Sequence, residues 1–86
     1  MNKDLLDIIN SISWFIENNY DIEANQSTPL LGKNSAISSL SVMELVAWCE
    51  DTYNIRNLLE DDLFLDSLAS VYTLSERILL LKGGNL

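Results

Sequence analysis

The chain of 86 residues contains no histidine, one cysteine, one proline and only five lysine or arginine residues. Without histidine, the usual general base and the commonest metal ligand at neutral pH are absent, so we expect neither an enzyme nor a metal site. A single cysteine, Cys49, excludes an intramolecular disulfide and argues against a zinc cluster. Its helical spacing from Leu45 and Val46 predicts a small buried hydrophobe rather than a reactive thiol.

The chain has thirteen aspartate and glutamate residues against five lysine and arginine residues, which gives a net charge of −8. Nucleic acid is not an expected ligand, because phosphate backbones require clustered lysine and arginine, and an anionic membrane surface is disfavoured for the same reason. Basic patches on partner proteins are the natural complement. No apolar run approaches the roughly 20 residues needed to span a bilayer. The segment Met1-Asn2-Lys3-Asp4 lacks the features of a signal peptide, so we expect a cytoplasmic protein.

What the chain does contain is typical of one small globular domain. Hydrophobic residues make up 48% of the sequence and charged residues 21%. A chain this short builds a single core, and no stretch has the composition of a linker. We therefore expect one domain over residues 1–86, with an ordered core at about 3–81, and a monomer.

Apolar residues recur at helical spacing in three segments, at about 3–19, 39–53 and 71–81. A short helical turn is expected at 60–65, and no segment shows the alternation of a strand. Between the first two helices, residues 21–37 form a long loop, which we expect to be fixed to the core by Leu30 or Leu31. The predicted fold is all-α, a small bundle of three main helices plus one short helix, with a long first loop.

The second helix begins at Ser39, with Ser38 as its N-cap. A helix N-terminus carries partial positive charge and unpaired N–H groups, which favour a phosphate. The hydroxyl of Ser39 is therefore well placed to carry a covalent phosphodiester.

The residues around Ser39 resemble the Asp-Ser-Leu-x-x-x-Glu-Leu-Val signature of acyl and peptidyl carrier proteins. Ser39-Leu40 and Glu44-Leu45-Val46 match that signature, and Ser70-Val71 is similar to the Thr-Val that opens the last helix of the family. Two positions depart from it: Ser38 stands in place of the family's Asp, and Ala36 in place of its glycine. Serine and aspartate are similar as N-caps, but Ser38 lacks the negative charge.

The resemblance implies a stand-alone carrier protein that catalyses nothing itself. A phosphopantetheinyl transferase, using coenzyme A and Mg²⁺, would attach 4'-phosphopantetheine to Ser39, and acyl, aminoacyl or peptidyl groups would be held on its thiol as thioesters. The expected partners are enzymes with basic patches that activate or transfer such groups, in fatty acid or secondary metabolite biosynthesis. The residues expected to contact them are Ser38, Leu40, Met43, Glu44, Ala47, Glu50 and Asp51.

Other interpretations remain open. The chain could be a carrier-like module that is never modified, or an unrelated acidic helical regulator of a basic partner. Ser67 lies in a literal Asp-Ser-Leu, but only one helix can follow it, so we favour Ser39. The acidic residues at 60–66 lack the spacing of an EF-hand and are expected to be solvated. Trp14 and Trp48 are expected to be packing residues; the alternative is that one of them lines a pocket for a bound chain.

Overall fold

The described part of the chain, residues 2–56 and 58–83 of a computed structural model, is built from helices and contains no strand. The elements are α1 (Lys3–Tyr20), α2 (Ser39–Tyr53), the 3-10 turn η1 (Leu58–Glu60), α3 (Phe64–Ser67) and α4 (Val71–Gly83). The predicted all-α bundle with three main helices and a long first loop is confirmed. The start of the second helix is at Ser39, as predicted, and the last helix runs two residues beyond the predicted end.

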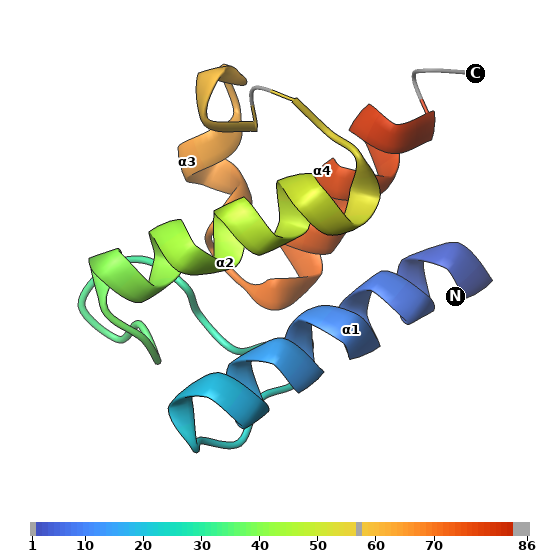
Figure 1. Cartoon of the computed structure of the whole chain (residues 1–86). Coiled ribbons are helices and arrows are strands. Elements are labelled where there is room, and N and C mark those ends of the chain that lie inside the picture. The colour runs from blue at the N-terminus through green and yellow to red at the C-terminus, as the bar shows by residue number, and fades with distance from the viewer. Residues whose placement is uncertain (1, 57, 84–86) are drawn as a thin grey trace.

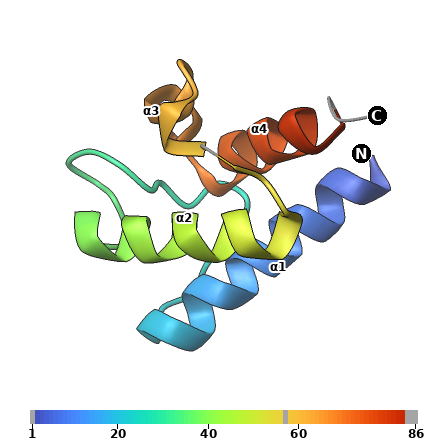
Figure 2. The same cartoon turned by 45° about the horizontal axis from the view of Figure 1, so that its top comes forward.

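The three long helices enclose one core (Figure 1). The start of α1 and the end of α4 lie on the same side of the molecule, and the start of α2 lies on the opposite side in both views (Figures 1 and 2). The end of α1 approaches the start of α2, where Tyr20 bonds to Ser41 and Glu44. Residues 17–20 and 39–44 are therefore neighbours in space.

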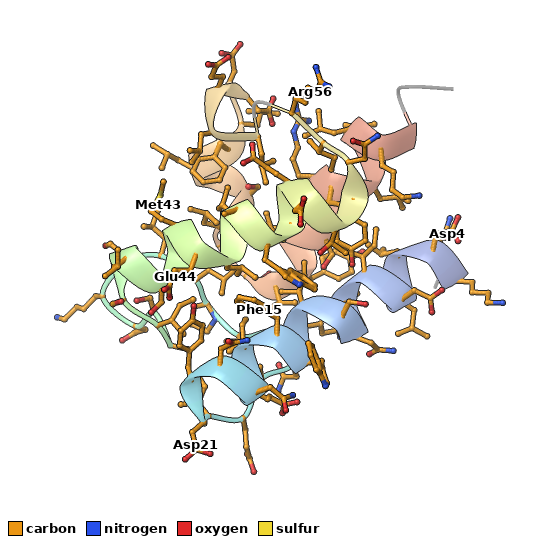
Figure 3. The ribbon with its side chains drawn as sticks, viewed as in Figure 1. Asp4, Phe15, Asp21, Met43, Glu44 and Arg56 are labelled. Atoms are coloured by element: carbon orange, nitrogen blue, oxygen red, sulfur yellow. The ribbon has the colours of Figure 1, made fainter. Side chains whose placement is uncertain are left out.

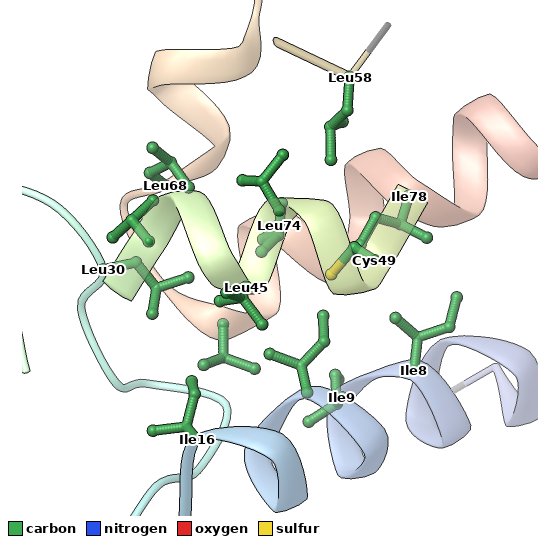
Figure 4. Packing of buried hydrophobic residues seen from close by; sticks show 14 of the residues in the cluster. Ile8, Ile9, Ile16, Leu30, Leu45, Cys49, Leu58, Leu68, Leu74 and Ile78 are labelled. Carbon is green, nitrogen blue, oxygen red and sulfur yellow. The ribbon is translucent and has the colours of Figure 1, made fainter. Parts of the chain in front are cut away.

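The buried apolar side chains come from every helix and form a single cluster (Figure 4). Of the long helices, α1 supplies the most members, and Val42 joins Leu45, Val46 and Cys49 on the core face of α2. Cys49 is fully buried in this cluster, as its spacing predicts. The fully buried members with the largest side chains are Ile12, Ile16, Leu30, Leu45, Leu58, Leu68, Leu74 and Ile78.

The long loop is held against the start of α4. Leu30 is fully buried and Leu31 is 45% exposed, so Leu30 is the residue that fixes the loop to the core. The carbonyls of Gln26 and Thr28 accept from the N–H groups of Tyr72 and Val71, at 2.8 and 2.9 Å. Two N–H groups that a helix start leaves unpaired are thus satisfied by the loop.

The predicted short helix at 60–65 is wrong in its bounds. The structure has η1 at Leu58–Glu60 and α3 at Phe64–Ser67, with a turn between them. Leu58 and Phe64 are both buried. On one continuous helix they would point about 120° apart, so the break lets both reach the same core.

The expectation that both tryptophans pack inside is wrong for Trp14, which is 58% exposed. Trp14 lies two residues from both Ile12 and Ile16, and two residues correspond to a rotation of about 200° around a helix. Burial of those two isoleucines therefore turns Trp14 outward. Trp48 is half-buried and packs on Phe15, with ring centroids 4.8 Å apart.

Candidate functional site

The start of α2 presents an exposed hydroxyl. Ser38 has an extended backbone, with φ of −73° and ψ of 164°, and its Oγ accepts from the N–H of Ser41 at 3.1 Å. Ser38 is therefore the N-cap, as the sequence predicted. Ser39 is the first helical residue and is exposed. Because the neighbouring serine does the capping, the Ser39 hydroxyl is left at the surface of the helix start.

Backbone N–H groups beside Ser39 are also open. The N–H of Ser41 is bonded to the Ser38 hydroxyl, and the N–H of Val42 donates to the Ser38 carbonyl at 2.9 Å. The N–H groups of Ser39 and Leu40 have no partner within residues 2–56 and 58–83. Two adjacent donors at the positive end of a helix dipole suit a phosphate.

At the start of α4, by comparison, the first backbone N–H groups already have hydrogen-bond partners. Its N–H groups at Val71 and Tyr72 bond to the long loop, and that of Thr73 donates to the Ser70 hydroxyl at 3.2 Å. Ser70 therefore caps α4. Ser67, in the literal Asp-Ser-Leu, is only 5% exposed, and its Oγ donates to the Phe64 carbonyl at 2.5 Å. The Ser67 hydroxyl is buried and hydrogen-bonded, whereas Ser39 is exposed. Of the two serines, Ser39 is therefore the more accessible to a modifying enzyme.

The residues expected to contact partners form the outer face of α2. The core face of this helix is formed by Val42, Leu45, Val46 and Cys49, and a shift of two positions leads to the opposite side. Leu40 is 74% exposed and Met43 45%, which is high for apolar side chains of this size. Ser38, Glu44, Ala47 and Asp51 are exposed as well.

The two glutamates of this face make different contacts. Glu44 lies on the side of α2 that faces the end of α1, and its Oε1 accepts from the Tyr20 hydroxyl at 2.9 Å (Figure 3). The same hydroxyl lies 3.2 Å from the Ser41 carbonyl. The pKa of Tyr20 is raised, by burial first and then by Glu44. This contact, which the sequence did not reveal, fixes α1 against the first two turns of α2.

Glu50 is only half-buried, and its Oε2 accepts from the N–H of Leu58 at 3.0 Å. Its carboxylate therefore holds the start of η1 against the end of α2. Of the acids expected at the partner face, Glu44 and Asp51 are the exposed ones.

Neither a metal centre nor a reactive thiol stands out in the part of the chain that the structure describes. It contains no group of three acidic, cysteine or histidine side chains that could hold an ion. Burial, and then the charge of Glu50, raise the pKa of Cys49 to about 12, so the thiol stays protonated. In the acidic 60–66 segment, Asp61 forms an ion pair with Arg77, which lowers the pKa of Asp61. None of the described helices is long and apolar enough to cross a bilayer.

A large groove lies away from Ser39. It has a volume of about 910 Å³ and is lined by residues of α1, α3 and α4 and their flanks. None of the residues that the sequence predicted as a site lines it. The start of α2 is therefore an exposed surface that lies outside this groove.

No family model, curated protein or solved structure matches this chain. A function has to come from the chemistry of the open helix start and of the face beside it. That chemistry is the exposed Ser39 hydroxyl, two N–H groups without a partner among the described residues, two exposed apolar side chains and two exposed carboxylates.

Proposed function

We propose that this chain is a stand-alone carrier protein that holds 4'-phosphopantetheine on Ser39. The observation that carries the proposal is the exposed Ser39 hydroxyl at an open helix start, with the neighbouring serine already used as the cap. The match of Ser39-Leu40 and Glu44-Leu45-Val46 to the carrier signature supports it. The buried and bonded Ser67 removes the main competing residue.

The residues at this helix start fit the group chemically. In the attachment step, Ser39 Oγ would form a bond to the β-phosphorus of coenzyme A. The pyrophosphate bond would break, the nucleotide part would leave, and the serine proton would pass to a base or water in the transferase site. The N–H groups of Ser39 and Leu40 are within the same turn and could donate to the resulting phosphodiester.

When bound, the group supplies a thiol that carries an acyl, aminoacyl or peptidyl unit as a thioester. The contribution of this chain is presentation. Leu40 and Met43 would give apolar contacts to an enzyme, and Glu44 and Asp51 would meet its basic residues. Since only two acids of this face, Glu44 and Asp51, are exposed, we expect apolar contacts to carry much of the binding to partners.

The experiment is intact-mass measurement of the purified chain after incubation with coenzyme A, Mg²⁺ and a broad-specificity phosphopantetheinyl transferase. We expect the mass to rise by one phosphopantetheinyl group. The gain should be absent in Ser39→Ala and present in Ser67→Ala, which is the matched control. Both variants should first be shown to be helical and cooperatively folded.

Two results would count against the proposal. A gain that persists in Ser39→Ala would place the group elsewhere. No gain with the wild-type chain, tested with several transferases, would favour the unmodified interaction module. If a basic partner were then found whose binding is unchanged in Ser39→Ala, the chain would be better described as an acidic helical regulator.

A further inference from the structure

The groove away from Ser39 has several leucines among its lining residues. It runs between the start of α1, α3 and α4, and its volume is about 910 Å³. Leu5 is buried at its base and Leu79 is half-buried. Leu63 and Leu80, which also line it, are 49% and 61% exposed. These two exposed leucines give the groove apolar side chains that a partner could cover.

The charged residues along this groove are mostly acidic. Asp4, Asp66 and Glu76 line it and are exposed, and they form no salt bridge within residues 2–56 and 58–83. Arg77 also lines the groove, but its guanidinium is bound by both oxygens of Asp61. The positive charge of Arg77 is therefore compensated, and the groove keeps the negative charge of three free carboxylates.

This combination selects among possible occupants. A second copy of the chain is disfavoured, because it carries thirteen acidic and five basic residues and would bring like charge to the groove. A small apolar ligand would stay largely in water, because the groove is open to solvent rather than enclosed. A helix with an apolar stripe flanked by lysine or arginine satisfies both the leucines and the carboxylates.

We propose that this groove, formed by the start of α1, α3 and α4, is a docking site for a basic amphipathic helix of a partner protein. The apolar stripe of that helix contacts Leu63 and Leu80, and its basic residues meet Asp4, Asp66 and Glu76. No residue of α2 lines the groove. A partner bound there leaves the Ser39 hydroxyl and the outer face of α2 accessible, so this site is additional to the proposed carrier function and independent of it.

The probe is a synthetic helix of about 18 residues, with leucines along one stripe and lysines on both flanks. A peptide of the same composition in scrambled order is its control, since it keeps the charge and loses the stripe. Binding to the full-length, ¹⁵N-labelled chain is followed by NMR and by titration near physiological salt. We expect the ordered peptide to bind more tightly than the scrambled one, with the largest shifts at α4, α3 and the start of α1.

Variants matched in charge and exposure make the test specific. The double change Asp66→Asn and Glu76→Gln should weaken binding by about fivefold, as expected for two exposed charge pairs. The double change Asp51→Asn and Glu23→Gln alters net charge equally, away from the groove, and should weaken it less than about twofold. Leu80→Gln should weaken binding, whereas Leu65→Gln, on α3 but outside the groove, should not.

Equal losses in the two double variants, or equal binding of the ordered and scrambled peptides, would overturn the proposal, because binding would then follow net charge alone. Largest shifts on the outer face of α2 would also overturn it. Ser39→Ala should bind the ordered peptide like the wild type. Failure of this docking site and failure of the carrier proposal can thus be told apart.

Discussion

Tyr20, the last residue of α1, donates a hydrogen bond of 2.9 Å to Glu44 in the second turn of α2. The bond joins two helices whose contacting residues are 24 positions apart in the sequence. Because Glu44 lies about one turn after Ser39, this bond also holds the start of α2 against the end of α1.

Tyr20→Phe should lower the free energy of unfolding by about 0.5–1.5 kcal/mol, because the hydroxyl loses its contacts with Glu44 and Ser41. Urea unfolding followed by circular dichroism measures this. Tyr72→Phe is the matched control, since the Tyr72 hydroxyl has no hydrogen bond to any described residue, and it should change stability by less than about 0.5 kcal/mol. Similar losses in both variants would show that the Tyr20 bond contributes nothing specific.

The Asp61–Arg77 ion pair predicts a pH-dependent contribution to stability. Arg77 lowers the pKa of Asp61 in the folded protein, mainly through the hydrogen bond between them. The folded state therefore holds the ionised form more strongly than the unfolded state does. The contribution is complete above the ordinary aspartate pKa of about 3.9 and is lost as the pH falls through the lower pKa of the folded state.

Asp61→Asn should therefore be less stable than the wild type at pH 7, and the two should converge in strongly acidic solution, where Asp61 is protonated and resembles asparagine. Urea unfolding at several pH values measures the difference. Asp62→Asn, the neighbouring exposed acid, should show no such convergence because it starts with little difference. A gap between Asp61→Asn and wild type that stays constant with pH would contradict the role of the ion pair.

Cys49 should be protected from thiol reagents in the native protein. Its side chain is fully buried and burial raises its pKa to about 12, so both access and thiolate are lacking. We expect an aromatic disulfide reagent at pH 8 to react at least about a hundredfold more slowly with the native chain than with the chain in urea. Equal rates would mean that α2 does not pack as described.

The sequence predicts features that depend on residues near one another in the chain better than features that depend on contacts between distant segments. The approximate bounds of the three long helices and the N-cap at Ser38 follow from local pattern, whereas that pattern left both Leu30 and Leu31 as candidates for the residue that fixes the loop. The exposure of Trp14 could also have been predicted from the sequence, because Trp14 lies opposite Ile12 and Ile16 on the same helix. General expectation for large aromatic residues led to the wrong prediction there.

Contacts between separate elements were not predictable from pattern. The bonds Tyr20 to Glu44, Glu50 to Leu58 and Asp61 to Arg77 depend on how the helices cross. Glu50 looks like any surface acid in the sequence, and only the fold shows that its carboxylate receives a backbone N–H. The leucine-lined groove likewise draws on three elements, and no single segment carries a signal for it.

The two tryptophans should be distinguishable by fluorescence. Trp48 packs between Phe15 and Tyr53, whereas Trp14 is largely in water. Trp14→Phe leaves Trp48 as the reporter, and we expect blue-shifted emission with weak quenching by iodide. Trp48→Phe should leave a red-shifted emission that iodide quenches readily. The reverse assignment would contradict the packing of α1 on α2.

Two substitutions of Ser38 separate its role as the N-cap from the effect of a negative charge beside Ser39. Ser38→Ala removes the acceptor for the Ser41 N–H and should cost about 0.5–2 kcal/mol in unfolding experiments. Ser38→Asp keeps an acceptor and adds a negative charge at the positive end of α2, so it should retain the stability of the wild type or exceed it slightly. It also restores the Asp-Ser-Leu of the carrier signature. Under the proposed function, Ser38→Asp should therefore be loaded with phosphopantetheine faster than the wild type, followed by intact mass over time. Slower loading of Ser38→Asp than of Ser38→Ala, with both variants folded, would show that the transferase does not read this position as it does in carrier proteins.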